Sequence, residues 1–328
     1  VRLCHSNRQL HQKVAGIVLG KIDQNSDVWS IGIGLDDTSP ETFCQCETCK
    51  DFGPTLTDRV VRFASAIAEQ VAQQRPDRRV SMFAYADWRD PPIEMKLHSH
   101  VVVVYVGVYT HGYLLASDRA ANHKLWDGWA QMIDGKMVWR PNMPESLGIP
   151  ILYAHQWAED MRRFEPKAWG ADVDALRGSW AAAGLNQYVM ARLLWKMDQD
   201  VDAIIDDYCE TGFGPAANAM RRYFTLLEQY TVEAAKQAPA HGYNHFCPWA
   251  PSFYTDQRIT VLEAHLEQAE KIAGNDTAWG QRVRFVRTAL DWTKLALPAW
   301  AIYAADGDRA KAKPLVRRMY AYLREHRE

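Results

Sequence analysis

Short apolar runs alternate with longer amphipathic stretches over the first 196 residues of the chain. The runs have strand length, and several are rich in β-branched residues, which is typical of strands buried in a parallel sheet. This alternation of strand and helix predicts successive βα units. The candidate strands are 1–5, 28–35, 79–86, 100–107, 137–141 and 168–174.

Helical periodicity fills the segments between these runs. Within 57–74, for example, Val60, Phe63 and Ile67 recur at the spacing of one helix face. A closed (β/α) barrel has eight strand–helix units, and the pattern here supplies six. We therefore expect an α/β, TIM-barrel-like fold whose first two strands lie upstream of Val1, with an open doubly wound sheet as the alternative. The predicted helices of this half are 8–21, 57–74, 118–133 and 150–164.

Strand signals end after about residue 185. Amphipathic stretches follow, and one longer loop between them contains Pro239, Gly242, His245, Cys247, Pro248 and Pro251. We therefore expect two domains, a barrel portion at 1–184 that carries the site and an α-helical domain at 185–328. The predicted helices of the second half are 185–196, 199–210, 214–236, 255–273, 276–299 and 307–326.

Composition narrows the class of protein. The chain has 328 residues, of which 48% are hydrophobic, and a formal net charge of −2. This balance predicts a soluble globular protein and gives no sign of a nucleic-acid partner. The longest apolar stretch, Val101–Val106, is far shorter than the roughly 18 residues of a membrane span. The chain starts at Val1 with no signal sequence before it, so we expect a fragment or a processed chain.

Polar side chains follow several candidate strands at their carboxyl ends. Barrels of this type place their chemistry at that end of the strands, so this distribution favours the barrel over the doubly wound sheet. The residues are His5, Asp36, Asp37, Tyr85, Asp87, Tyr109, His111, Arg140, Asn142, Asp172 and Asp174.

The best active-site candidate is the acid pair Asp36–Asp37 at the end of the run 28–35. One carboxylate of such a pair stays ionised, while its neighbour, beside a like charge, keeps a proton and acts as a general acid. Paired carboxyl groups of this kind suit glycoside cleavage. The alternative is that both residues only cap the following turn, as aspartate commonly does.

Three closely spaced thiols, Cys44, Cys46 and Cys49, follow the acid pair. Thiolates at such spacing favour zinc, and Cys4 or a histidine could complete four ligands. Standard zinc ribbons use two Cys-x-x-Cys pairs, and only one half is present here. The sequence therefore favours a single disulfide or reduced thiols over a metal site.

Thirteen tryptophans are many for a chain of this length. Flat aromatic rings cover the apolar faces of sugars, so Trp88, Trp139 and Trp180, which lie at or after strand ends, are predicted sugar platforms. Gly32 and Gly34 lack the third glycine of a dinucleotide-binding loop. We therefore predict no nucleotide and no other cofactor.

Parts of the chain resemble the domain-of-unknown-function family 4838. The most specific match is the segment IGIGLDDTSPETFCQCETCK. Similar pieces are Thr57-Asp58-Arg59-Val60 with Phe63, Met82-Phe83-Ala84-Tyr85 ahead of Pro91-Pro92, and Gly184-Leu185-Asn186-Gln187-Tyr188-Val189 with Leu194-Trp195.

That family is similar to α-glucuronidase and hexosaminidase-like barrels. Some of its members, classed as glycoside hydrolase family 163, are endo-β-N-acetylglucosaminidases that act on complex N-glycans. The resemblance implies a retaining, acetamido-assisted mechanism with Asp37 as the acid and Asp36 as the orienting partner. Members often carry asparagine where this chain has Asp36. The resemblance also implies a secreted or periplasmic protein.

Our leading hypothesis is a glycoside hydrolase that cleaves an N-acetylhexosaminide within an oligosaccharide or glycan. An α-glucuronidase-like hydrolase, with Arg140 binding the uronate carboxylate, and a non-catalytic glycan-binding module are the alternatives. Unpaired backbone at the edges of a truncated barrel would favour a homo-oligomer. The predicted catalytic residues are Asp37 and Asp36, and the predicted substrate-binding residues are Tyr85, Asp87, Trp88, Tyr109, His111, Trp139, Arg140, Asn142 and Asp174.

Overall fold

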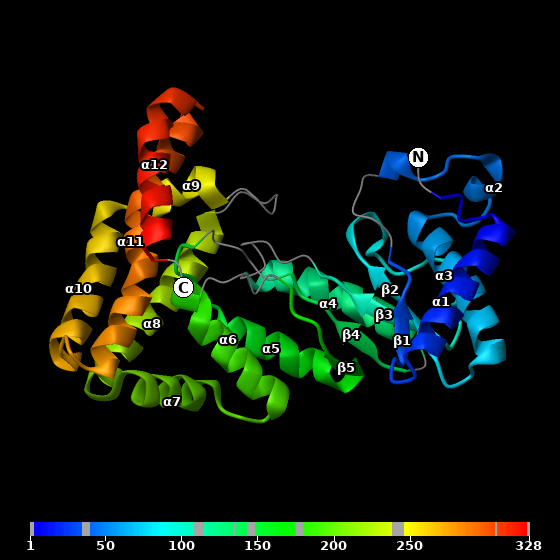
Figure 1. Ribbon diagram of the computed structural model, residues 1–328, viewed down its shortest axis with the longest axis horizontal. Coiled ribbons are helices and arrows are strands. Elements are labelled where there is room, and N and C mark those ends of the chain that lie inside the picture. Colours follow the sequence, from blue (N-terminus) through cyan, green and yellow to red (C-terminus); the bar gives the residue numbers. More distant parts are fainter. Residues whose placement is uncertain are drawn as a thin grey trace. The chain divides into compact units, whose positions relative to one another are not determined.

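The computed structural model divides the chain into two compact units (Figure 1). Unit 1 consists of Val1–Val108, Ala120–Asn142 and Phe164–Asp174, and unit 2 consists of Tyr109–Arg119, Met143–Arg163 and Ala175–Glu328. The structure describes residues 3–34, 40–107, 115–133, 135–142, 148–174, 180–237, 246–305 and 307–326.

Unit 1 is built on a five-stranded parallel sheet. Its strands are β1 (Ser30–Gly32), β2 (Arg79–Ala84), β3 (Val101–Tyr105), β4 (Met137–Trp139) and β5 (Ala168–Ala171). The order in the sheet, β1-β2-β3-β4-β5, is the order along the chain. A doubly wound sheet reverses its strand order at a switch point, and the described strands contain no such reversal.

The two edge strands of this sheet approach each other through a pair of tryptophans. Trp29 directly precedes β1, Trp169 lies in β5, and their ring centroids are 4.4 Å apart in an edge-to-face arrangement. In a flat sheet, four strand spacings of about 4.8 Å would separate β1 from β5 by roughly 19 Å. The ring contact therefore indicates a strongly curled sheet.

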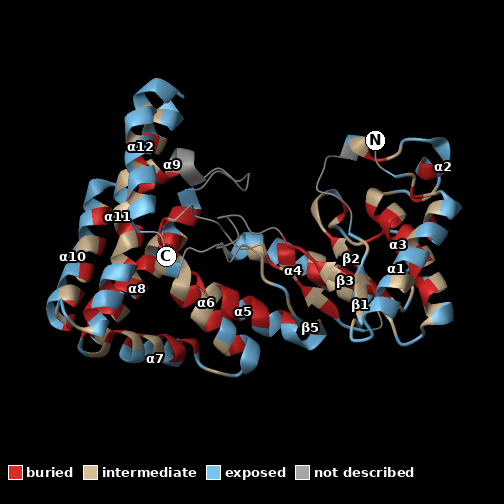
Figure 2. Ribbon diagram, in the orientation of Figure 1, coloured by how far each residue is buried: buried red, intermediate tan, exposed pale blue. Residues whose placement is uncertain are grey.

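Helices precede or follow most of these strands in the chain. α1 (Arg8–Gln24) precedes β1, and the single-turn α2 (Glu47–Lys50) and α3 (Leu56–Gln74) come between β1 and β2. α4 (Ala116–Gln131) comes between β3 and β4, and α5 (Ala154–Phe164) comes between β4 and β5. The helices α1 and α3 lie side by side, and α3 packs on β2 (Figure 1). The apolar stripe of α3 is its buried face, coloured red in Figure 2, so hydrophobic burial fixes the helix against the sheet.

An aromatic cluster fills the core beneath β3 and β4. The ring of Trp126 lies 5.6 Å from Tyr105 and 4.5 Å from Phe164, and Trp139 lies 5.2 Å from Phe164. All four side chains are at most 2% exposed. Their burial fixes Phe164 in the core of unit 1.

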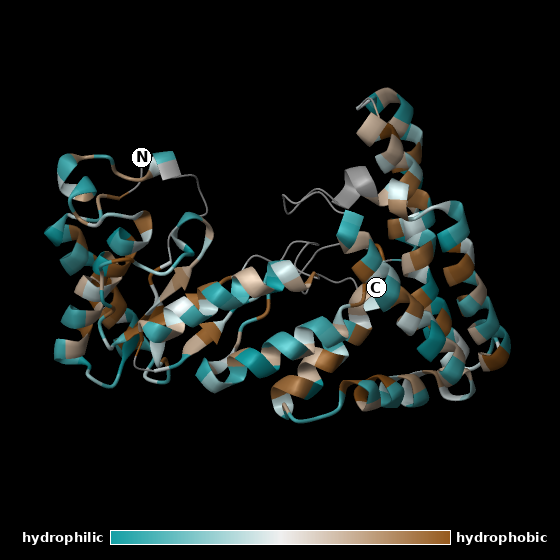
Figure 3. Ribbon diagram, turned by 180° about the vertical axis from the view of Figure 1, so that it is seen from behind, coloured by the Kyte–Doolittle hydropathy of each residue, from teal (hydrophilic) through white to brown (hydrophobic). Residues whose placement is uncertain are grey.

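In the described part of unit 2, every element from residue 180 onward is a helix. α11 (Ala278–Ala305) packs against α6, α7, α9, α10 and α12. Figure 3 shows both hydrophobic and hydrophilic positions on these helices, the pattern of helices that bury one face. The remaining helices are α6 (Trp180–Trp195), α7 (Val201–Phe213), α8 (Ala217–Gln237), α9 (Phe246–Phe253), α10 (Asp256–Ala273) and α12 (Arg309–Glu325).

Two sequence predictions are wrong. Residues 3–7 form a turn rather than part of a strand at 1–5, because the Asn7 N–H bonds to the Cys4 carbonyl at 3.0 Å and the Asn7 side chain caps α1. The expected loop around Pro248 and Pro251 contains the eight-residue helix α9. A proline in the first helical turn, as Pro248 is, loses no backbone hydrogen bond.

Candidate functional site

Backbone hydrogen bonds extend the parallel ladder beyond the carboxyl ends of the last strands. The Arg140 N–H donates to the Tyr105 carbonyl at 2.8 Å, and the Asp174 N–H donates to the Pro141 carbonyl at 3.0 Å. Asn142 and Asp174 form a parallel bridge. The segments that follow β4 and β5 are therefore held in register, and their polar side chains meet at one edge of the sheet.

Four of these side chains, Arg140, Asn142, Asp172 and Asp174, form what we call the edge cluster. Arg140 Nε donates to Asp172 Oδ2 at 3.0 Å, and Arg140 Nη1 donates to Asn142 Oδ1 at 3.1 Å and to Asp174 Oδ2 at 3.3 Å. The guanidinium also lies 5.4 Å from the centroid of the Phe83 ring. These contacts fix the arginine, so the cluster is preorganised.

The edge cluster carries more negative than positive charge. One guanidinium faces two carboxylates, which leaves a net charge of −1. The Asp172 and Asp174 side chains are 63% and 38% exposed, so their oxygens remain accessible to a ligand. Exposed carboxylates beside an amide suit hydrogen bonds to hydroxyl groups and repel an anionic ligand.

The segment after β2 supplies the next predicted residues on this edge. Tyr85 is partly buried and Asp87 is exposed. Between them Ala86 has a φ of 48°. This left-handed conformation costs a non-glycine residue roughly 1–2 kcal/mol, and such strain is concentrated at functional sites.

The prediction that Trp88 and Trp139 are exposed sugar platforms is wrong. Trp88 is 1% exposed, and its Nε1–H donates to the Phe83 carbonyl at 3.0 Å. Trp139 is 2% exposed and packs on Phe164. Both rings lie in the core because the chain turns inward after β2 and because alternate residues of β4 face the core. Trp180, at the start of α6 in unit 2, is 53% exposed.

Four predicted site residues lie outside the described residues. They are the acid pair Asp36 and Asp37, which follow β1 in the chain, and Tyr109 and His111, which follow β3. Of the predicted site residues, the structure describes Tyr85 and Asp87, three residues of the edge cluster, and the buried rings of Trp88 and Trp139.

The thiols of Cys4, Cys44, Cys46 and Cys49 form a second group in unit 1, which we call the thiol cluster. All four Sγ atoms lie within 4.8 Å of one another. The hydroxyl of Ser6 lies 3.3 Å from Cys4 Sγ, and its hydrogen bond lowers the pKa of the Cys4 thiol to about 7. The sequence analysis identified three of these cysteines as possible metal ligands. It gave Cys4 as one possible fourth ligand, although it predicted a strand at that residue.

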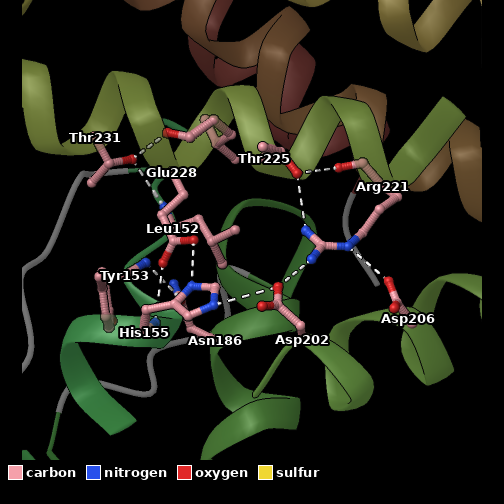
Figure 4. Close-up of polar contacts among 11 residues, drawn as sticks. Leu152, Tyr153, His155, Asn186, Asp202, Asp206, Arg221, Thr225, Glu228 and Thr231 are labelled. Carbon is pink, nitrogen blue, oxygen red and sulfur yellow. Dashed lines mark hydrogen bonds and ion pairs between the residues drawn. The ribbon is translucent and has the colours of Figure 1, made fainter. Parts of the chain in front are cut away.

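Sequence reasoning missed a polar network in unit 2 that is centred on His155 and Arg221 (Figure 4). His155 Nδ1 donates to Glu228 Oε2 at 2.7 Å, and its backbone N–H donates to Glu228 Oε1 at 3.1 Å. Asp202 pairs with both His155, at 3.5 Å, and Arg221. The hydrogen bond to Glu228 raises the pKa of His155. The partners are too far apart in sequence for any spacing motif to reveal them.

Buried hydrogen bonds beside this network join the two residues before α5 to α6 and α8 (Figure 4). The Tyr153 N–H donates to Asn186 Oδ1 at 2.9 Å, and the Leu152 N–H donates to Thr231 Oγ1 at 3.1 Å. These side chains satisfy the backbone donors of the two residues that precede α5, for which the helix itself offers no acceptor. We therefore interpret the network as structural support for the helices.

The fold and the edge cluster define a mixed α/β protein with a curled parallel sheet and a charged, preorganised carboxyl edge. The chain belongs to the family described as "Domain of unknown function (DUF4838)", which it matches over residues 1–225. No curated protein and no solved structure matches the chain. In the described part of the chain, no helix is long and apolar enough to cross a membrane.

Proposed function

We propose that this protein is a glycoside hydrolase that cleaves an N-acetylhexosaminide by a retaining, acetamido-assisted mechanism. The observation that carries the proposal is the edge cluster, which holds Arg140, Asn142 and Asp174 together at the carboxyl edge of a parallel sheet. Enzymes with βα-barrel sheets bind their substrates at this edge. Membership of DUF4838, with the resemblance of that family to glycosidase barrels, supports the same class.

A barrel-type sheet is part of this proposal. The sequential order of the five parallel strands is the order of a (β/α) barrel. The contact between Trp29 and Trp169 adds the curl that barrel closure needs. Further strands would complete the barrel between β5 and β1.

The edge cluster favours a neutral sugar over a uronic acid. The Nε and Nη1 donors of Arg140 are already bonded to Asp172, Asn142 and Asp174. A uronate would have to displace these acceptors and approach two carboxylates. The cluster instead offers acceptors to sugar hydroxyls, so the α-glucuronidase alternative has less support.

In the proposed reaction the acetamido oxygen of the substrate attacks the anomeric carbon. The glycosidic C–O bond breaks, and Asp37 gives its proton to the leaving oxygen. Asp36 orients the acetamido group and accepts a hydrogen bond from its N–H. Asp37, now ionised, takes a proton from water as the water opens the cyclic intermediate, which restores the acid and retains the anomeric configuration.

The first test compares the parent with Asp37→Asn on para-nitrophenyl N-acetyl-β-glucosaminide and on a complex N-glycan. Loss of a general acid is expected to lower kcat/KM on the N-glycan by about 10²- to 10⁴-fold. The loss on the para-nitrophenyl glycoside should be smaller, because nitrophenolate leaves with little need of a proton. Asp27→Asn is the matched control, because Asp27 is an exposed carboxylate that precedes β1 and so lies away from the carboxyl edge. Unchanged turnover of the N-glycan by Asp37→Asn would remove Asp37 from the mechanism.

Three further measurements separate the alternatives. Replacing the acetamido group of the substrate by trifluoroacetamido weakens its oxygen as a nucleophile, so the assisted mechanism predicts a much slower reaction. Cleavage of aryl uronides in preference to N-acetylhexosaminides would favour the α-glucuronidase. Calorimetric binding of a glycan with no product formed would favour the binding module.

A further inference from the structure

We propose that Cys4, Cys44, Cys46 and Cys49 bind one zinc ion as a structural site. The residues come from two segments, the turn before α1 and the loop that leads into α2. Their four Sγ atoms lie within 4.8 Å of one another. The inference does not depend on the proposed hydrolase activity.

The sulfur separations fit a single tetrahedral ion. With Zn–S bonds of about 2.3 Å, tetrahedral geometry places neighbouring sulfurs about 3.8 Å apart. Cys4 Sγ lies 3.5 Å from Cys49 Sγ and 3.8 Å from Cys46 Sγ. A disulfide would join only two of the four cysteines and would give no reason for all four to converge.

Local structure explains how the sequence brings these thiols together. Cys46 is the N-cap of α2, and Cys49 lies in the same turn, because its N–H bonds to the Cys46 carbonyl at 2.9 Å. This turn places two thiols of a Cys-x-x-Cys pair on the same side. Cys4 enters from the other segment, where the Asn7 cap of α1 fixes the turn.

The chemistry of the ligand set selects the ion. Four thiolates form a soft, closed donor set, which is typical of structural zinc, whereas catalytic zinc sites keep a position for water. Ser6 adds a supporting hydroxyl, which lies 3.2 Å from Cys49 Sγ and 3.3 Å from Cys4 Sγ. Such neighbours orient metal ligands and strengthen binding.

The ion would join two chain segments that apolar packing already brings together. Phe43, next to Cys44, is 5% exposed, and its ring packs against His5 and Trp88. The metal would therefore lock the loop that follows β1 onto the turn that starts α1, and its loss would loosen this corner of unit 1.

The test measures metal in the full chain, purified with a phosphine reductant and without chelators. Elemental mass spectrometry is expected to find one zinc ion per chain. Cobalt(II) added to the metal-free protein is expected to give the intense sulfur-to-metal charge-transfer bands of a tetrahedral tetrathiolate site. Absence of both zinc and this cobalt spectrum would overturn the proposal, and the cobalt measurement does not require any variant to fold.

Variants test which residues bind the ion. Cys46→Ala removes an exposed ligand and is expected to abolish stoichiometric zinc, whereas Cys209→Ala, in α7 of unit 2, is expected to keep it. Ser6→Ala is expected to weaken zinc affinity by about 10- to 100-fold. Full zinc content and unchanged cobalt bands in Cys46→Ala would place the metal elsewhere. None of these readouts depends on Asp37.

Discussion

At the scale of single residues, Asp58 is a carboxylate buried inside unit 1. Its side chain is fully buried, and its oxygens accept hydrogen bonds from the backbone N–H groups of Ile93, Glu94 and Met95 at 3.3, 2.9 and 2.9 Å. It also accepts from the Thr55 hydroxyl, and its own N–H bonds to that hydroxyl at 3.1 Å. Burial alone would raise its pKa, but these hydrogen bonds lower it overall.

We expect Asp58→Ala to destabilise the protein strongly. The change removes a buried carboxylate that accepts three partly buried backbone hydrogen bonds. Hydrogen bonds to a charged group contribute about 1.5–3 kcal/mol each, so the free energy of unfolding should fall by at least about 3 kcal/mol. Urea denaturation followed by circular dichroism measures it. Asp90→Ala is the control, because Asp90 is exposed and its loss should change stability by less than about 0.5 kcal/mol. Equal midpoints for the two variants would contradict this account.

The sequence predicted the residues that meet at the edge of the sheet but not the burial of the two tryptophans near them. Arg140, Asn142 and Asp174 could be placed together because the ends of neighbouring parallel strands meet at one edge. The burial of Trp88 and Trp139 could not be foreseen, because a ring at a strand end can turn either to solvent or into the core. That choice depends on partners such as Phe164, which are distant in sequence.

At the scale of elements, most helices were predictable because they bury an apolar stripe. The prediction of 57–74 corresponds to α3 at Leu56–Gln74, and that of 255–273 corresponds to α10 at Asp256–Ala273. The wrong predictions lie where a helix cap or a proline has more influence than the pattern of hydrophobic residues. Asn7 caps α1, so the residues before it form a turn where a strand was expected. Pro248 and Pro251 led to the prediction of a loop where the structure has α9.

Gly214 shows how one position can hold two helices close together. It ends α7 with a φ of 51°, and a Cβ there would lie only 2.7 Å from Nε1 of Trp279 on α11. Glycine is therefore required twice at this position, once for the left-handed backbone and once for the approach of the indole.

We expect Gly214→Ala to lower the thermal midpoint. The left-handed conformation alone costs about 1–2 kcal/mol in a residue with a Cβ, and the clash with Trp279 adds to this cost. Gly212→Ala is the matched control, because a Cβ at Gly212 meets nothing within 4 Å and alanine favours the helix. Differential scanning calorimetry should show opposite shifts or, for Gly212→Ala, no shift. A higher midpoint for Gly214→Ala would contradict the structure.

At the scale of the whole molecule, histidines with opposite pKa shifts shape the response to pH. Burial lowers the pKa of His98 and of His265, so both favour their neutral forms in the folded protein. The hydrogen bond to Glu228 raises the pKa of His155 above its ordinary value of 6.5. The stabilisation from His155 is therefore fully present below about pH 6.5 and is lost as the pH rises through its raised pKa.

We expect His155→Gln to lose more stability in acid than in alkali. The difference in thermal midpoint between parent and variant should be largest near pH 6 and should shrink towards pH 8.5, because only protonated His155 pairs with the carboxylates of Glu228 and Asp202. His265→Gln, which replaces a histidine of opposite shift, should not show this trend. A difference that is independent of pH would show that the charge of His155 contributes nothing.

The contact between Trp29 and Trp169 should make the curl of the sheet detectable by circular dichroism. Two indoles this close share their electronic excitations, so they should produce a pair of circular dichroism bands of opposite sign that an isolated indole lacks. Both rings are more than 40% exposed, so replacing either by phenylalanine should remove the signal while leaving the core intact. Opening or closing of the sheet margins during ligand binding could then be followed without any added label.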